Sequence, residues 1–174
     1  MLTTIIGKDI LPRDSGVCTR CSIRLKLVNV TNECEEGATF DGSNEHISLD
    51  NLANEIIKQQ NKAAGDGKEI SNVEISFTVK TTTCPDLTVV DLPGMFENAG
   101  SGQNKDAPKQ VEKMVKRYCR DKNTIMMCVS DANVDLENCK GLKVCRQIDR
   151  EGERTIGVLT KCDKLEDGQE IKIL

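Results

Sequence analysis

The chain has 174 residues, of which 37% are apolar and 30% charged, a balance that predicts one soluble domain with a buried core. Its net charge is -4 and it has no dense basic tract, so nucleic acid is a poor candidate partner. No apolar run approaches the roughly 20 residues that span a bilayer, and the first residues lack the pattern of a secretory signal. We expect a cytoplasmic protein that meets a membrane, if at all, only peripherally.

Nine cysteines are scattered along the sequence, and their odd number argues against a disulfide framework. Reduced thiols are the favoured interpretation. The alternative is a zinc site formed by the C-x-x-C of Cys18 and Cys21 with Cys34 and His46. Because the chain offers no second pair of closely spaced ligands, this alternative ranks well behind.

The first part of the chain predicts the end of a helix at residues 1–6, stopped by Gly7. Apolar and basic residues then alternate over 22–30, which predicts a strand with one wet face. Residues 31–45 are polar and acidic and predict a surface loop. Ser48 can cap a helix that ends near Gly65.

In the second part of the chain strands and helices alternate. A strand with alternating apolar residues is predicted at 73–79, buried strands at 87–90 and 125–129, and a further strand at 155–159. Helices are predicted from Asp106 and Pro108 onward and over 136–148. The alternation predicts a layered α/β fold with a largely parallel sheet and with ligands at the carboxyl ends of the strands.

Asp91-Leu92-Pro93-Gly94 follows one predicted buried strand. In phosphate-hydrolysing switch proteins an aspartate at such a strand end approaches Mg²⁺, and the glycine brings a bare backbone N–H to the γ-phosphate. The tetrapeptide alone is also an ordinary turn, so its weight comes from the motifs around it.

Thr160-Lys161-Cys162-Asp163 follows another predicted strand. The Asp163 carboxylate can accept hydrogen bonds from guanine N1–H and N2–H₂, while the Lys161 stem packs over the purine. Adenine lacks this pair of donors and would leave the carboxylate unpaired. An exposed loop with a Lys/Asp pair is the alternative for the isolated motif.

Thr19 follows Asp14-Ser15-Gly16, a segment expected to be flexible. A loop of this kind can fold over a ligand and bring a hydroxyl group to a metal ion and to the attacking water. Each of the three sites is a weak signal alone. Together they indicate a GTPase, because they occur in the order of its switch and base-binding elements.

Four stretches, 11–20, 85–95, 129–136 and 154–163, resemble the G domain of the dynamin superfamily, including its Mx branch. The resemblance implies a three-layer α/β fold of the P-loop GTPase kind, with GTP as substrate and Mg²⁺ as cofactor. It also implies hydrolysis coupled to dimerisation of G domains, and action on a membrane or on a filament such as a microtubule through regions outside this sequence.

Carried onto this chain, the resemblance gives Thr19 and Gly94 catalytic roles and makes Thr19 and Asp91 the Mg²⁺-facing residues. It implies that residues 91–94, Thr160, Lys161 and Asp163 bind GTP, and that Asp135 contacts the partner G domain.

The sequence departs from the family pattern before its first switch. No glycine-rich G-x-x-x-x-G-K-[ST] loop precedes Thr19, and the central strand that leads into that loop is expected to be missing. The favoured hypothesis is a fragment of a dynamin-like GTPase. The alternative is a degenerate G domain that docks on full-length relatives without hydrolysing GTP.

Overall fold

The computed structural model describes residues 2–12, 19–65, 67, 69–100 and 102–165. The chain divides into two compact units, which are Met1–Gly94 with Asn98–Val111, and Met95–Glu97 with Glu112–Leu174. Each unit has its own β-sheet, and an apolar core of its own is described for each. The Asp14-Ser15-Gly16 segment and Cys18 lie outside the described residues.

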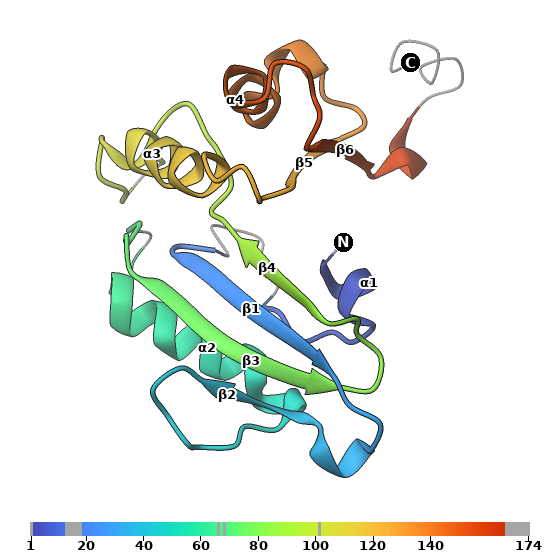
Figure 1. The fold of residues 1–174 in the computed structure, drawn as a ribbon. Coiled ribbons are helices and arrows are strands. Elements are labelled where there is room, and N and C mark those ends of the chain that lie inside the picture. Colours follow the sequence, from blue (N-terminus) through green and yellow to red (C-terminus); the bar gives the residue numbers. More distant parts are fainter. Residues whose placement is uncertain (1, 13–18, 66, 68, 101, 166–174) are drawn as a thin grey trace. The chain divides into compact units, whose positions relative to one another are not determined.

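The first unit contains a four-stranded sheet in the order β2-β3-β1-β4 (Figure 1). β1 runs parallel to β3 and antiparallel to β4, and β2 runs antiparallel to β3. The elements of this unit are α1 (Leu2–Ile6), β1 (Ser22–Asn29), the 3₁₀ helix η1 (Glu33–Glu35), β2 (Gly37–Phe40), α2 (Leu49–Ala64), β3 (Glu74–Thr81) and β4 (Leu87–Asp91).

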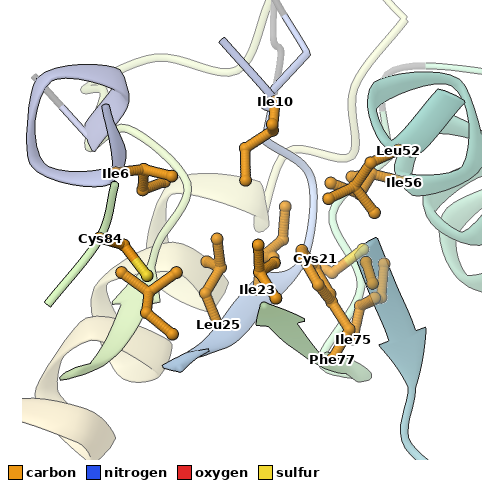
Figure 2. Packing of buried hydrophobic residues seen from close by; sticks show 13 residues of the cluster. Ile6, Ile10, Cys21, Ile23, Leu25, Leu52, Ile56, Ile75, Phe77 and Cys84 are labelled. Atoms are coloured by element: carbon orange, nitrogen blue, oxygen red, sulfur yellow. The ribbon is translucent and has the colours of Figure 1, made fainter. Parts of the chain in front are cut away.

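Alternating residues of β1 and β3 form the core of this unit. Leu25 and Phe77 are fully buried, and α1 and α2 cover the same face of the sheet with Ile6, Leu52 and Ile56 (Figure 2). Burying an aliphatic or aromatic side chain of this size contributes about 1.5–3 kcal/mol relative to leaving it exposed. The alternation over residues 22–30 therefore predicted both the strand and its buried face.

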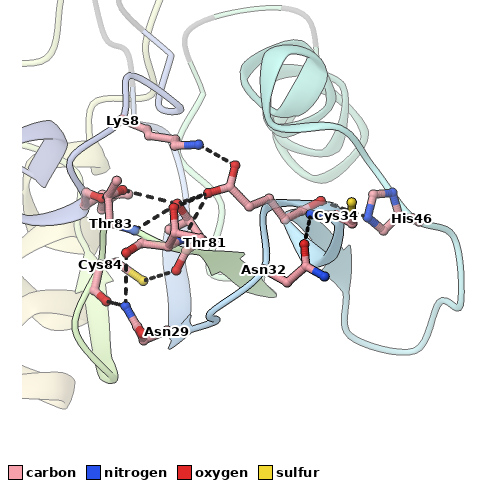
Figure 3. A network of polar contacts seen from close by, with 11 residues as sticks. Lys8, Asn29, Asn32, Cys34, His46, Thr81, Thr83 and Cys84 are labelled. Atoms are coloured by element: carbon pink, nitrogen blue, oxygen red, sulfur yellow. Dashed lines mark hydrogen bonds and ion pairs between the residues drawn. The ribbon is translucent and has the colours of Figure 1, made fainter.

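A polar network joins three segments at the end of β3 (Figure 3). The Glu36 carboxylate accepts hydrogen bonds from the Lys8 ammonium, from the Thr81 hydroxyl (2.9 Å), and from both the backbone N–H and the hydroxyl of Thr82 (2.9 Å each). The Thr83 hydroxyl donates to the carbonyl of Ile6 at 2.9 Å. The network ties α1 and the start of β2 to the end of β3.

The second unit contains a parallel pair of strands, β5 (Met126–Asp131) and β6 (Thr155–Thr160). Its helices are α4 (Lys140–Ile148) and the 3₁₀ helices η2 (Leu136–Asn138) and η3 (Cys162–Lys164). The division between the units falls within α3 (Ala107–Cys119). Cys119, Met126, Cys128 and Cys145 form the buried core of this unit.

The α/β class is confirmed. The sheet of the first unit is mixed, with one parallel and two antiparallel pairings, and the strand pair of the second unit is parallel. The surface loop predicted at 31–45 contains β2, which the polar composition concealed. The helix predicted at 136–148 is divided at Cys139 into η2 and α4, because Cys139 has extended backbone angles.

The prediction of fully buried strands at 87–90 and 125–129 was wrong. Leu87 is 43% exposed, Ile125 precedes β5 and is 67% exposed, and Met127 and Val129 are also exposed. In the described part of the chain β4 pairs only with β1, and β5 pairs only with β6. An apolar run is buried on both faces only where other elements cover both, which these strands lack.

A search of the described residues finds no helix that is both long and apolar enough to cross a bilayer.

Candidate functional site

Thr19 and Asp91 are held together by the pairing of β1 with β4. The antiparallel register places Ile23 opposite Asp91, so the segment that enters β1 lies beside the end of β4. The Thr19 hydroxyl donates a hydrogen bond to Asp91 Oδ2 at 2.9 Å. Burial raises the pKa of Asp91, and the hydrogen bonds from Thr19 and from the Leu92 N–H oppose that rise. Two side chains that the sequence singled out 72 residues apart thus touch.

The donor set at this point suits a hard cation. A hydroxyl and a carboxylate are oxygen ligands, which Mg²⁺ prefers, and a partly desolvated carboxylate gains most from a nearby positive charge. Thr19 and Asp91 therefore fit the roles of Mg²⁺-facing residues that the sequence assigned to them.

Arg20 anchors the backbone next to Thr19. Its buried guanidinium donates to the carbonyls of Gly65 (2.5 Å) and Gly67 (2.7 Å) and to the side chain of Asn61. Its backbone N–H donates to Gln60 Oε1 at 2.7 Å, and Gln60 is itself buried. These bonds attach the Thr19 segment to the end of α2. Sequence analysis missed this role, because an arginine after a switch threonine gives no sign of its distant partners.

The other residues of the Asp91–Gly94 motif differ in burial. Pro93 is buried, Leu92 is partly exposed and Gly94 is exposed. A Cβ built at Gly94 would meet no atom within 4 Å. Among the described residues, no neighbour of Gly94 therefore requires a glycine at this position.

The Thr160–Asp163 motif is organised by Asp131, the last residue of β5. The parallel register pairs Asp131 with Thr160, at the carboxyl ends of β5 and β6. Thr160 Oγ1 donates to Asp131 Oδ1 at 3.0 Å, and Lys161 Nζ lies 2.6 Å from Asp131 Oδ2. The bond from Lys161, and then that from Thr160, lowers the pKa of Asp131.

Lys161 is the one non-glycine residue in the described ranges with a positive φ, at 56° with ψ of 37°. A left-handed backbone is uncommon for lysine, and strain of this kind clusters at functional sites. Asp131 was missed as a functional residue by sequence analysis. Its position at the end of the strand that neighbours the motif is the signal that would have identified it.

Asp163 lies in η3, just after β6, and is exposed. Among the described residues its carboxylate has no hydrogen-bond or ion-pair partner, so its oxygens are available to a ligand. Asp163 belongs to the second unit, whereas Thr19, Asp91 and Gly94 belong to the first.

Asp135 has a local role in the structure. It is the N-cap of η2, and its Oδ1 accepts a hydrogen bond from the Glu137 N–H at 2.9 Å. Its side chain is exposed, and its assignment as a dimer contact stays a prediction.

The ligands of the alternative zinc site do not gather. Cys21 is fully buried in the core of the first unit, Cys34 is exposed, and Cys18 is outside the described residues. His46 Nε2 lies 3.1 Å from the carbonyl oxygen of Glu36. Within the described ranges no three His, Cys, Asp or Glu side chains are placed to hold a metal ion.

Comparison with known proteins identifies the family. The sequence pattern of the dynamin family matches residues 1–162. The chain belongs to the dynamin family. Its G-domain motifs, predicted from the four stretches above, are therefore those of a dynamin-superfamily G domain.

Three similar relatives show the breadth of this dynamin-family match. The chain is 34% identical to dynamin of Drosophila melanogaster over 172 residues, covering 99% of this chain and 20% of the relative. It is 39% identical over 167 residues to the interferon-induced GTP-binding protein Mx of Gallus gallus, covering 94% and 24%. It is 36% identical over 172 residues to human dynamin-1, covering 99% and 20%. The chain thus spans about a fifth to a quarter of the length of these relatives.

Proposed function

We propose that this chain contributes the switch and base-binding elements of a domain that binds GTP and hydrolyses it to GDP and phosphate. The observation that carries the proposal is the hydrogen bond between Thr19 and Asp91, which joins the two residues assigned to Mg²⁺. Family membership supports the same conclusion, and one relative is named a GTP-binding protein.

In the first unit, the residues proposed to act on the phosphates are Thr19, Asp91 and Gly94. Asp91 and Thr19 would hold Mg²⁺, which when bound neutralises charge on the β- and γ-phosphates. The Thr19 hydroxyl would orient the attacking water, and the Gly94 N–H would donate to a γ-phosphate oxygen. Arg20 keeps Thr19 in place through its bonds to the end of α2.

In the second unit, the residues proposed to bind guanine are Lys161 and Asp163. Asp163 would accept the guanine N1–H and N2–H₂, and the stem of Lys161 would cover the purine ring. Asp131 fixes the ammonium group of Lys161, so the stem is positioned before the base arrives. Pre-organisation of this kind reduces the entropy lost on binding.

The finer parts of the proposal come from the family resemblance. Asp135 would contact a second G domain in a dimer. Action as a dynamin-like mechanoenzyme is proposed for the protein to which these elements belong.

The test uses the purified 174-residue chain with guanine and xanthine nucleotides. Saturation-transfer difference NMR detects weak binding and reports which ring protons contact the protein. Asp163→Asn should weaken GTP binding and strengthen XTP binding, because an amide can donate to the C2 carbonyl of xanthine. Asp135→Asn is the matched control, because it also replaces an exposed carboxylate by an amide. This variant should bind GTP in preference to XTP, as the original chain does. Equal selectivity of the Asp163→Asn variant and the original chain would refute the assignment.

A further inference from the structure

Four cysteines gather in the core of the second unit. Cys119 ends α3, Cys128 lies in β5, Cys139 precedes α4 and Cys145 lies within α4. No metal site accounts for the cluster, since no group of three ligand side chains suited to a metal ion is found in the described part of the chain. All four are free thiols.

The Cys128 thiol shares this core with two other thiols. Cys145 is buried in the same cluster and Cys139 packs against it, and both thiols add to the rise that burial causes in the pKa of Cys128. A Cβ built at Gly141 would lie 3.3 Å from the sulfur of Cys128 and 3.9 Å from that of Cys139. The two sulfurs therefore face the same small space, beside a residue that has no side chain to separate them.

The three thiols differ in their access to solvent. Cys128 and Cys145 are buried, whereas Cys139 is partly exposed. Burial raises the pKa of Cys128 to about 12, so this group stays a thiol at neutral pH and does not react first with an oxidant. A dissolved oxidant would meet Cys139 first and would leave its product next to Cys128.

We propose that Cys139 and Cys128 form a redox pair that a peroxide converts to an intramolecular disulfide. The sulfur of Cys139 attacks the peroxide, the O–O bond breaks, and Cys139 becomes a sulfenic acid while one water is released. The sulfur of Cys128 then displaces the hydroxyl of the sulfenic acid, which leaves as a second water with the Cys128 proton. The two thiols lose two electrons in total, and hydrogen peroxide is reduced to two waters.

The disulfide would tie β5 to the start of α4 and close residues 129–138 into a loop. That loop contains Asp131 and η2. Any effect of the disulfide on base binding through Asp131 and Lys161 rests on the proposed function. Formation of the disulfide does not depend on the proposed function.

The test oxidises the reduced full chain with hydrogen peroxide under native conditions. Remaining thiols are trapped with N-ethylmaleimide, and peptides are mapped by mass spectrometry without reduction. The expected product is the Cys128 peptide joined to the Cys139 peptide in most molecules, and dithiothreitol should reverse it. Oxidation confined to the exposed Cys34 and Cys162, or a link from Cys128 to Cys145, would overturn the proposal.

Two variants separate the steps. Cys128→Ala should stop the reaction at the Cys139 sulfenic acid, which dimedone captures. Cys139→Ser changes a partly exposed position and is the second variant, should the buried change prevent folding. In the Cys139→Ser variant Cys128 should stay reduced during oxidant treatment, so N-ethylmaleimide should alkylate it once the sample is unfolded. Oxidation of Cys128 in this variant would contradict the proposal that Cys139 reacts first. Cys145→Ala should keep the Cys128–Cys139 disulfide, and its loss in this variant would count against the pair.

Discussion

The carboxylate of Asp131 holds Lys161 at 2.6 Å, between the ends of two neighbouring parallel strands. The same carboxylate also accepts a bond from Thr160. One residue at the end of β5 therefore sets the side-chain positions of half of the Thr160–Asp163 motif.

Replacing Asp131 by Asn should impair nucleotide binding more than stability. The pair with Lys161 is largely exposed and screened by solvent, so the free energy of unfolding should change little. The uncharged amide holds the Lys161 ammonium less firmly, and affinity for a guanine nucleotide should fall several-fold. Titration of labelled GTP, with denaturant unfolding of the same samples, measures both effects. A variant that binds as well as the original chain would contradict the role given to Asp131.

Replacing Arg20 by Lys should destabilise the first unit. A single ammonium cannot reproduce the bonds of the buried guanidinium to Gly65, Gly67 and Asn61, so hydrogen bonds of a buried side chain are lost. A loss of about 1–3 kcal/mol in the free energy of unfolding is expected. Arg24→Lys is the matched control, because Arg24 bonds to Glu74 at a more exposed site. Comparable losses in the two variants, measured by urea unfolding, would show that the bonds of Arg20 have no special weight.

The Glu36 network should make stability depend on acid pH. The bond from Lys8, and then those from Thr82 and Thr81, lowers the pKa of Glu36 from 4.5 to about 2. A carboxyl group with a lowered pKa in the folded state stabilises that state above its unfolded pKa, and loses this effect as pH falls through the folded value. The stability difference between the original chain and Glu36→Gln should therefore be full above pH 4.5 and shrink towards pH 2. Thermal unfolding across this range checks it, and a difference that does not vary with pH would contradict it.

Gly37→Ala should destabilise the start of β2. The residue has a φ of 154°, and a Cβ there would lie 2.2 Å from His46 Nε2. Strain and overpacking together should cost about 1–3 kcal/mol in the free energy of unfolding. Gly94→Ala, where a Cβ meets no atom within 4 Å, should change stability by less than about 0.5 kcal/mol. Adding His46→Ala to Gly37→Ala should restore part of the lost free energy of unfolding, because the clash with His46 is removed. No recovery would contradict the overpacking part of this prediction and would leave backbone strain as the whole cause.

Local patterns predicted much of the fold. The alternation in β1 and β3 and the helical spacing in α2 and α3 depend on neighbours within the same segment, so they can be read from one sequence. β2 could not be found in this way, because its four residues are held by pairing with β3, far along the chain. The exposed faces of β4 and β5 were missed for a similar reason. An apolar run does not reveal which of its faces another element covers.

The motifs indicated candidate site residues, but they did not indicate the partners that come from elsewhere in the chain. Thr19 and Asp91 were both assigned to Mg²⁺ from the sequence, and their side chains are hydrogen-bonded in the structure. Arg20 and Asp131 were not assigned roles, since their partners lie at least 29 residues away and belong to no motif. The roles in catalysis, metal binding, nucleotide binding and dimerisation that were assigned from the sequence all stay predictions.

The pairing of Asp131 with Thr160 has a consequence for how this surface tolerates change. In a β-strand adjacent side chains point to opposite faces, so sliding β5 past β6 by one residue would turn the carboxylate away from both Thr160 and Lys161. Single-residue insertions or deletions within either strand should thus abolish the arrangement, whereas those in the helix-containing connection between them should spare it. The alignment of two strands, more than the identity of any one contact, keeps the lysine in place.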